Sequence, residues 1–316
     1  MTPDTRPLII YHADCNDGLT AAWAIKRAFA AKHQDVELFP AKYQTPPNVN
    51  KRFVIIADFS YKRPVLQEML ETAYRIEIYD HHKSAQADLE GLAHPKLRVV
   101  FDMERSGAGI AWDEFHGEEP RPWFVNYVED NDLWRHKLDN CKAVLEYIRS
   151  YPAMQHFAMY DEWMNGHNPQ EVPLGILVEG DAILRAKKVL VEQSLTFHHE
   201  EELLIGDGPH QGPLKVLVAN VPFFLSSEVA GALAEMNRDH QDIPVGITYY
   251  QREDGRWSLS FRSIGDFDVS KLALSFGGGG HRNAAGATVN DLPWALPLYK
   301  LESKDEGKTW TTARVE

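Results

Sequence analysis

The chain has little of three things: cysteine, long apolar runs and clustered positive charge. Only Cys15 and Cys141 are cysteines among its 316 residues, which is the usage of a protein kept in a reducing compartment, so we expect a cytoplasmic location. No segment approaches the roughly 18 consecutive apolar residues of a membrane span. Residues 1–6 also lack the basic and apolar regions of a signal peptide, and we therefore expect no membrane partner.

The scarcity of positive charge limits the partners of the chain. It carries 33 Lys and Arg against 46 Asp and Glu, for a formal net charge of -13. Binding of long nucleic acid draws on many Lys and Arg contacts to phosphate, and no basic run is present to supply them. The acidity therefore opposes a long duplex as a partner, and it favours a short ligand should the chain bind nucleic acid at all.

The length and composition are those of a folded protein of more than one domain. A length of 316 residues exceeds one typical core, and an apolar share of 44% is enough for packed interiors. Strand and helix patterns alternate at both ends of the chain and predict the α/β class, with a mostly helical stretch between them. We expect an N-terminal domain at 1–152, a helical connector at 153–205 and a smaller α/β domain at 206–316.

Polar side chains follow three short apolar runs, at 7–11, 52–57 and 75–79. Such runs are typical of strands buried on both faces of a parallel sheet, whose carboxyl ends meet at one edge. Carboxylate oxygen and neutral imidazole nitrogen are ligands that Mn²⁺, Fe²⁺ and Zn²⁺ prefer. So many acids at one edge would repel each other unless cations lay between them, so the sequence predicts a two-metal site. The residues delivered to this edge are His12, Asp14, Asp17, Asp58, Asp80, His81 and His82.

Two further acids follow in a predicted helix at 122–133. Asp130 and Asp132 are two residues apart, which turns their side chains about 200° from each other on a helix. Only one of them should therefore face the metals.

With these segments the chain resembles the DHH phosphoesterase superfamily, and within it the members that carry the DHH-associated C-terminal domain. The motifs of that family occur in order and span nearly the whole chain: His12-x-Asp14-x-x-Asp17-Gly18, then Asp58, then Asp80-His81-His82, then Asp130, and finally the glycine-rich segment 277–286. The resemblance implies a parallel-sheet DHH domain and a smaller α/β domain, with the active site in the cleft between them. It also implies two Mn²⁺ ions, for which Mg²⁺, Fe²⁺ or Co²⁺ could substitute.

The resemblance further implies roles for individual residues. The metal ligands would be His12, Asp14, Asp17, Asp58, Asp80, His81 and Asp130. Asp58 would bridge two ions about 3.5–4 Å apart. Asp58, Asp80 and His82 would be the catalytic residues, with His82 donating to a phosphoryl oxygen or to the leaving oxygen. The spacing inside the first motif leaves open whether Asp14 or only Asp17 reaches a metal.

The C-terminal domain is expected to bind substrate rather than metal. Four consecutive glycines leave backbone N–H groups free to adopt positive φ and to form a concave anion-binding nest. The predicted substrate-binding residues are Arg262, Gly278, Gly279, Gly280, His281 and Arg282. Phe223 and Phe224 are the preferred candidates for stacking on bases, ahead of Tyr127 and Trp134. The segment 198–202, His-His-Glu-Glu-Glu, is interpreted as a solvated helix terminus.

Together these features predict a Mn²⁺-dependent phosphodiesterase or exonuclease that hydrolyses short oligonucleotides, linear dinucleotides among them, to mononucleotides. A nucleoside 3′,5′-bisphosphate phosphatase and a cyclic dinucleotide phosphodiesterase are the alternatives. A ligand-sensing module without activity is a third reading, which would require lost ligands. We expect a short oligonucleotide or dinucleotide as the partner, and a homodimer is left open.

Overall fold

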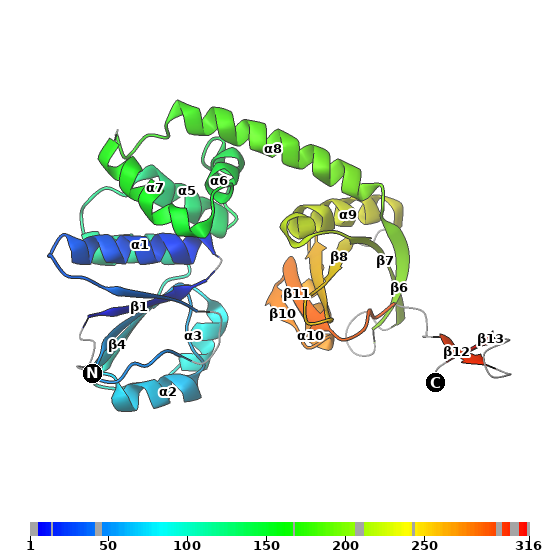
Figure 1. Cartoon of the computed structure of the whole chain (residues 1–316), viewed down its shortest axis with the longest axis horizontal. Helices are drawn as coiled ribbons and strands as arrows, with labels where there is room; N and C mark the ends of the chain where they lie inside the picture. The colour runs from blue at the N-terminus through cyan, green and yellow to red at the C-terminus, as the bar shows by residue number, and fades with distance from the viewer. Residues whose placement is uncertain are drawn as a thin grey trace. The chain divides into compact units, whose positions relative to one another are not determined.

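The computed structural model describes residues 6–13, 15–41, 46–166, 168–205, 212–241, 244–294, 299–303 and 310–314. The chain divides into two compact units, Met1–Arg185 and Ala186–Glu316. Each unit is built from helices and strands, so the expected α/β class is confirmed (Figure 1). The border between the units falls within helix α8 (Leu174–Leu195).

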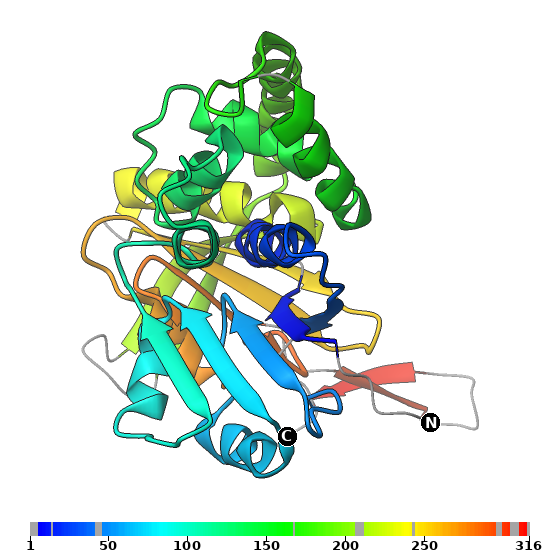
Figure 2. The same ribbon diagram turned by 90° about the vertical axis from the view of Figure 1, so that its left-hand side faces the viewer.

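A parallel five-stranded sheet forms the centre of unit 1. Its strands lie in the order β2-β1-β3-β4-β5, and every neighbouring pair is parallel. The apolar runs seen in the sequence are its central strands, because a strand covered on both faces needs Ile, Val and Leu at successive positions (Figure 2). The strands are β1 (Leu8–His12), β2 (Glu37–Ala41), β3 (Phe53–Ala57), β4 (Arg75–Asp80) and β5 (Leu97–Phe101).

Alternate residues of each strand point to two separate cores. Ile9 and Ile55 face α1 (Asn16–Ala30) and α4 (Gly107–His116). The neighbouring residues Leu8, Ile10 and Ile56 instead pack against α2 (Arg63–Thr72) and α3 (Lys83–Leu89). Figure 1 shows α1 on one face of the sheet, with α2 and α3 on the other. The strand period of two therefore divides the apolar residues between both faces.

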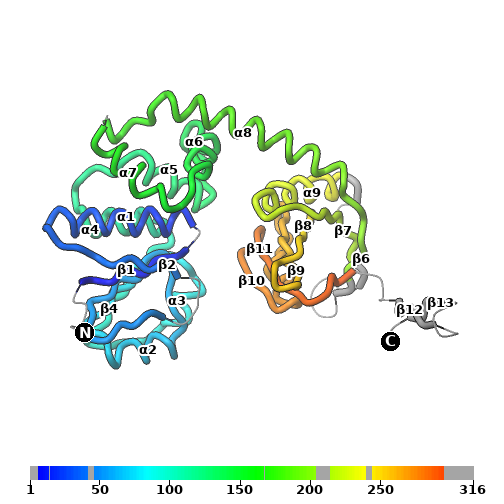
Figure 3. The backbone as a smooth tube through the Cα atoms, viewed as in Figure 1, coloured from blue at the N-terminus to red at the C-terminus, as the bar shows by residue number. Residues whose placement is uncertain are grey.

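A further set of helices packs over α1 through aromatic side chains. The ring of Trp23 on α1 stacks on Trp112 at 5.9 Å and meets Phe124 at 5.1 Å and Tyr160 at 5.6 Å. These contacts fix α1, whose first turn carries Asp17. Figure 3 follows the chain through this set: α5 (Trp123–Asp132), α6 (Cys141–Arg149), α7 (Ala153–Gly166) and the start of α8.

Unit 2 contains a mixed six-stranded sheet in the order β10-β11-β9-β8-β7-β6. Only β7 and β8 are parallel, and helix α9 connects them. The expected smaller α/β domain is thereby confirmed. Its elements are β6 (His199–Ile205), β7 (Gly212–Asn220), η1 (Phe223–Leu225), α9 (Ser226–Gln241), β8 (Val245–Gln251), β9 (Trp257–Ser263), α10 (Val269–Ser275), β10 (Gly279–His281) and β11 (Ala284–Val289); β12 (Tyr299–Ser303) and β13 (Trp310–Arg314) form a separate two-stranded sheet.

Two observations bear on the sequence predictions for this region. The segment 199–202, interpreted as a helix terminus, is part of strand β6, because helix α8 already ends at Leu195 and the following residues pair with β7. Among the described residues, no helix combines the length and the apolar character needed to cross a bilayer.

Candidate functional site

The candidate site lies at the carboxyl edge of the unit 1 sheet. His12 ends β1, Asp58 directly follows β3 and Asp80 ends β4. The strand order reverses between β1 and β3, and a crevice at such a reversal is where open α/β sheets bind ligands. The sheet therefore brings together the strand-end residues that the sequence pattern selected.

Asp58 is the central carboxylate of the site. It is 1% exposed, and its φ of 63° lies in the left-handed region, which residues other than glycine rarely adopt. Its Oδ1 lies 3.2 Å from His81 Nε2 and its Oδ2 lies 3.5 Å from His12 Nδ1. Burial would raise the pKa of this carboxyl group, but the neighbouring imidazoles of His12 and His81, with the charge of His82, hold it below its usual range.

Three carboxylates lie around Nε2 of the His81 imidazole. Besides Asp58, its Nε2 lies 3.4 Å from Asp132 Oδ2 and 3.6 Å from Asp17 Oδ2. Burial lowers the pKa of His81, but the hydrogen bond to Asp58 and the charges of Asp132 and Asp58 raise it overall. Burial, followed by the charge of Asp58, raises the pKa of Asp132 to about 6, and the same causes with the charge of Asp132 raise that of Asp17.

Asp17 is held by the amino end of helix α4. Its Oδ2 accepts a hydrogen bond from the Gly107 N–H at 2.6 Å, and its Oδ1 accepts one from the Ala108 N–H at 2.9 Å. A Cβ on Gly107 would lie 2.6 Å from the Asp58 Cβ and 2.9 Å from Asp17 Oδ2, so only glycine allows this approach. The N–H groups that open this helix therefore bind an anion that the chain itself provides.

Asp80 and His82 form a pair beside the cluster. Oδ1 of the fully buried Asp80 accepts hydrogen bonds from the N–H groups of His81 (2.7 Å) and His82 (3.2 Å), and it lies 2.7 Å from His82 Nδ1. Burial lowers the pKa of His82, but the hydrogen bond and charge of Asp80 raise it to about 9. The other oxygen of Asp80, Oδ2, is buried and has no hydrogen-bond partner among the described residues.

The structure corrects the choice between the two acids of helix α5. Asp132, not Asp130, faces His81. Asp130 accepts hydrogen bonds from the N–H groups of Lys137 and Leu138 at 3.0 and 3.1 Å, so its carboxylate anchors the following loop. The geometric argument that only one acid could face the site agrees with the structure, but the family pattern selected the wrong one. The helix ends at Asp132, whose position in the last turn directs its side chain to the cluster.

Three groups of side chains have ligand atoms close enough to share an ion. They are His12 with Cys15 and Asp58, Asp58 with His81 and His82, and Asp17 with His81 and Asp132; within each group the atoms lie within 4.8 Å of one another. Asp80 and Asp130 belong to none of them, and Asp14 lies outside the described residues. The sequence analysis did not select Cys15 or Asp132 as ligands. The signal for Cys15 was its place within the first motif.

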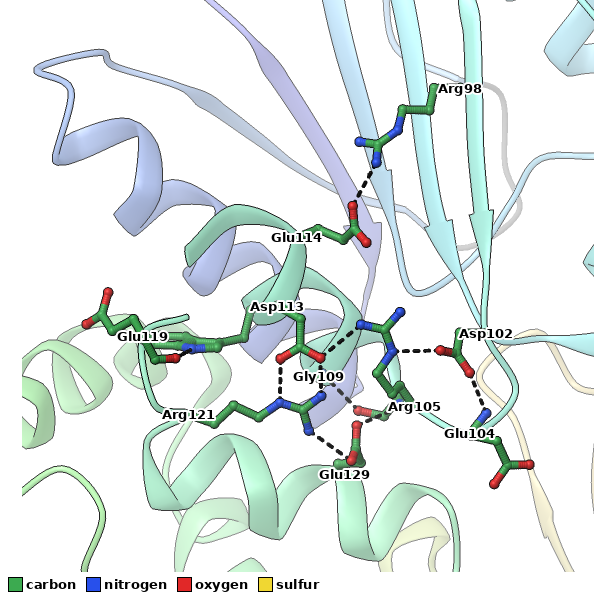
Figure 4. Close-up of polar contacts among 12 residues, drawn as sticks. Arg98, Asp102, Glu104, Arg105, Gly109, Asp113, Glu114, Glu119, Arg121 and Glu129 are labelled. Atoms are coloured by element: carbon green, nitrogen blue, oxygen red, sulfur yellow. Dashed lines mark hydrogen bonds and ion pairs between the residues drawn. The ribbon is translucent and has the colours of Figure 1, made fainter. Parts of the chain in front are cut away.

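A network of arginines and acids supports the edge of the site at α4 and α5. The buried Glu129 accepts a hydrogen bond from the Ser106 N–H at 3.0 Å and another from Arg121 Nη1 at 2.9 Å. Arg121 also donates from Nε to Asp113 at 2.7 Å, and Arg105 Nη1 donates to the same carboxylate at 2.9 Å (Figure 4). Ser106 caps α4, so the network holds the helix end on which Asp17 rests.

In unit 2 the glycine run of the sequence is a helix end followed by an edge strand. The N–H of Gly277 donates to the Leu274 carbonyl and that of Gly278 donates to the Ala273 carbonyl, so both close helix α10. Gly279 and Gly280 pair with β11. Of the four glycines, Gly277 and Gly280 have positive φ, whereas a nest built on the whole run was expected.

The basic residues of unit 2 have different surroundings. Arg262 on β9 donates to the Ser227 hydroxyl from Nε at 3.2 Å and from Nη2 at 3.1 Å, and burial lowers the pKa of its guanidinium. Arg282 is exposed and donates to Asp266 through Nη2 at 2.7 Å. His281 is exposed at the end of β10. The substrate-binding role of these residues stays a prediction.

One family model matches part of the chain, and one known protein is similar over nearly all of it. Residues 214–304, most of unit 2, match the DHHA1 domain. An uncharacterized protein, R106, of Acanthamoeba polyphaga mimivirus is 25% identical over 95% of this chain and 71% of its own length.

Solved structures are similar over most of the chain. A pGpG-specific phosphodiesterase, PggH, from Vibrio cholerae is 12% identical with a TM-score of 0.49, over 90% of this chain and 93% of that one. RecJ from Thermus thermophilus in complex with Mn²⁺ is 17% identical with a TM-score of 0.47, over 90% of this chain and 49% of that one.

The resemblance to a known family draws on both ends of the chain. The N-terminal motifs occur in the family order, and His12, Asp58 and Asp80-His81-His82 meet at one edge of a parallel sheet. The DHHA1 match covers the glycine-rich segment that completes the pattern. Residues 214–304 thus match the DHHA1 domain, and the N-terminal motifs of the chain resemble those of the DHH phosphoesterase superfamily.

Proposed function

We propose that the chain is a metal-dependent phosphodiesterase that cleaves short oligonucleotides, linear dinucleotides among them, to mononucleotides. One observation carries the proposal. Three carboxylates and two imidazoles from separate elements converge at the carboxyl edge of the unit 1 sheet, with ligand atoms within 4.8 Å of one another in each group. The converging residues are His12, Asp17, Asp58, His81 and Asp132.

The donor set fits divalent metal ions. Carboxylate oxygen and imidazole nitrogen suit Mn²⁺, Fe²⁺ and Zn²⁺, and we propose Mn²⁺ as the ion. The pKa values of Asp17 and Asp132 are raised by burial and by neighbouring negative charge, and a bound cation would relieve this repulsion. The unpartnered, buried Oδ2 of Asp80 is a further oxygen that an ion could satisfy.

The donor groups would suit two adjacent ions, because Asp58 lies between His12 of one group and His81 of the other. One would be held by His12 and Asp58, close to Cys15, and the other by Asp17, His81 and Asp132. The two oxygens of Asp58 already face opposite neighbours, His12 and His81. When bound, such ions polarise a phosphoryl oxygen and lower the pKa of a water molecule, so that it can attack phosphorus.

His82 is the residue that we assign to proton transfer. Asp80 Oδ1 lies 2.7 Å from its Nδ1, which fixes the orientation of the ring and leaves Nε2 to meet the substrate. A donor at this point would protonate the leaving oxygen or hydrogen-bond a phosphoryl oxygen. Asp80 thus acts through His82, which distinguishes it from the acids that surround His81.

Substrate size is inferred from charge. A net charge of -13 opposes the many phosphate contacts on which long strands depend. Arg262, His281 and Arg282 in unit 2 are the residues that we propose bind the far end of a short substrate. Arg262 suits this role because its hydrogen-bond partners are hydroxyl and carbonyl groups. Among the described residues no carboxylate forms an ion pair with it, so its charge could pair with a phosphate.

The test is a substrate panel with the purified full chain. With Mn²⁺, a linear dinucleotide and short oligoribonucleotides should be cleaved to mononucleotides, and chelator should abolish the reaction until Mn²⁺ is restored. Asp58→Asn should be folded and inactive. The panel includes a nucleoside 3′,5′-bisphosphate and a cyclic dinucleotide, so faster cleavage of either would replace the proposed substrate. Full activity in excess chelator would overturn the metal-dependent mechanism, and tight binding without turnover of any compound would favour a sensing module.

A further inference from the structure

The loop that follows Asp132 has an unusual backbone. Within residues 133–140, three side-chain-bearing residues adopt left-handed conformations: Trp134 (φ 54°), His136 (φ 46°) and Asn140 (φ 58°). Such conformations are unfavourable for residues with a Cβ and persist only where the surroundings impose them. The loop is therefore held in one shape.

Asp130 provides most of that restraint. Its main-chain carbonyl accepts hydrogen bonds from the N–H groups of Arg135 at 2.9 Å and His136 at 3.3 Å. Its carboxylate accepts from those of Lys137 and Leu138 at 3.0 and 3.1 Å. Four consecutive backbone N–H groups thus bind one residue, which fixes the path of the chain immediately after Trp134.

This rigid loop leaves a large aromatic side chain in solvent. Trp134 is 67% exposed, whereas Trp23, Trp112 and Trp123 are at most 2% exposed. The ring of His136 meets the indole at 5.7 Å in an edge-on arrangement and supports its position. An exposed indole adds nothing to the core, and on an ordered loop it offers a large flat apolar face that suits a planar ligand.

The place of the loop identifies that ligand. Trp134 lies two residues after Asp132, whose Oδ2 is 3.4 Å from His81 Nε2 in the phosphoester site. A residue this near in sequence cannot be far from the site, because successive Cα atoms are about 3.8 Å apart. A nucleobase is the planar group attached to the phosphoester that the proposed reaction cleaves. Aromatic side chains bind bases of any sequence by stacking.

We infer that Trp134 is the base-stacking residue for the nucleotide whose phosphate lies in the site, and that Asp130 positions its loop. The inference rests on the proposed function for the identity of the ligand. It differs from the sequence expectation, which preferred Phe223 and Phe224. Those two side chains are also exposed, but they belong to unit 2, whereas Trp134 is on the segment that carries a cluster acid.

The test separates the base from the phosphate. Binding of adenosine 5′-monophosphate and of ribose 5-phosphate is measured by calorimetry on the full chain with Mn²⁺. Trp134→Ala should weaken binding of the nucleotide roughly 5- to 150-fold, the range for loss of one stacked base, and leave binding of ribose 5-phosphate unchanged. Trp134→Phe should retain most of the affinity because it keeps an aromatic face. Tyr74→Ala is the matched control, since Tyr74 is 71% exposed and precedes β4 at the edge opposite to the site.

Kinetics on a dinucleotide complete the test. Trp134→Ala should raise KM with little change in kcat or in bound metal, because stacking acts on binding. Wild-type affinity for the nucleotide in Trp134→Ala would overturn the inference, and so would an equal loss for ribose 5-phosphate. If the wild-type chain binds the nucleotide but cleaves no compound of the panel, the proposed function fails, while the calorimetric comparison still decides the role of Trp134.

Discussion

The backbone of Asp58 links the two halves of the candidate metal centre. Its left-handed conformation costs about 1–3 kcal/mol in a residue with a side chain, and its N–H is held by the Tyr79 carbonyl at 2.9 Å. In this conformation the carboxylate faces His12 with one oxygen and His81 with the other. The strain is thus concentrated at the residue that lies between His12 of one group of ligands and His81 of the other.

The two acids of helix α5 provide a matched pair of variants. Asp132→Asn should reduce metal binding and lower activity by roughly 10- to 100-fold, because this carboxylate faces the proposed ion beside His81. Asp130→Asn should keep the metal and instead destabilise the loop by about 1–3 kcal/mol, since an amide cannot accept both N–H groups through two oxygens. Metal analysis, activity and urea unfolding of both variants test the assignment. Loss of metal from Asp130→Asn alone would reverse it.

At this scale the sequence predicted strand ends better than helix ends. His12, Asp58 and His81 follow buried apolar runs, and the edge of a parallel sheet brings such positions together whatever the loops do. The side chains of Asp130 and Asp132 depend on how the last turn of a helix is rotated. That rotation comes from packing of α5 on α1 and α4, which no local pattern encodes.

At the scale of elements, the amino end of helix α4 connects Asp17 of the candidate metal centre with Glu129 of the neighbouring ion-pair network. Gly107 and Ala108 hold Asp17, an arrangement that the positive end of the helix dipole favours. Ser106 is bound by Glu129, and a Cβ on Gly109 would lie 1.9 Å from that carboxylate, so the helix and the acid fit only with glycine there. Gly107 and Gly109 at the start of this helix therefore allow it to pack closely against acids on both sides.

The ion pairs behind this helix predict a pH dependence of stability. Burial would raise the pKa of Asp113, but hydrogen bonds and charge from Arg121 and Arg105 hold it below its usual range. A lowered folded-state pKa gives stability that is complete above the unfolded value of about 3.9 and is lost as the pH falls through the folded value. Asp113→Asn should therefore be less stable than the wild type at pH 6, and the difference should shrink as the pH falls below about 4.

Urea unfolding across that pH range checks the prediction. The matched control is Asp35→Asn, an exposed acid in the turn before β2. A difference between wild type and Asp113→Asn that stays constant down to the lowest pH at which both fold would contradict the ion-pair account.

Helix α8 approaches α6 closely at Gly180, which allows a second test at the scale of elements. A Cβ on Gly180 would lie 2.2 Å from the Ala143 carbonyl oxygen, whereas one on Gly175 of the same helix would meet nothing within 4 Å. Gly180→Ala should destabilise unit 1 by about 1–3 kcal/mol through overpacking. Gly175→Ala should be neutral or stabilise it by up to about 1 kcal/mol. Thermal unfolding of both variants decides, and equal effects would refute close packing at Gly180.

The elements that the sequence analysis missed are short or lie at sheet edges. Strand β6 (His199–Ile205) contains three consecutive glutamates. It is a strand because its backbone pairs with β7. Strand β10 is three residues of a glycine-rich run that pairs with β11. Neither has the apolar alternation of a half-buried strand, since partner strands define them rather than their own side chains.

At the scale of the whole molecule, charge and site chemistry oppose each other. The chain carries a net charge of -13, and its candidate site adds buried Asp17 and Asp58 to a region that would have to accept the proposed anionic substrate. Metal ions would neutralise only the phosphate at the site, leaving further phosphates of a long strand against an acidic surface. The net charge could be read from the composition alone, whereas the burial of the two acids required the structure.

The conflict predicts a preference for short substrates. The value of kcat/KM should be highest for about two to five nucleotides and should not rise with further length. The reason is that the chain has few Lys and Arg side chains to neutralise the additional phosphates. It should also fall only weakly with added salt, since the slope of binding against salt follows the number of phosphates neutralised. An oligonucleotide series at two fixed salt concentrations measures both effects.

A control within this series separates length from charge. Oligonucleotides with uncharged methylphosphonate links beyond the second position keep the length of the strand and remove its distal charge. If repulsion sets the limit, these should be cleaved faster than ordinary strands of equal length, and as fast as the dinucleotide. A value of kcat/KM that instead rises steadily beyond about ten nucleotides, with a steep loss in salt, would require an extended basic groove, contrary to the acidity of the chain.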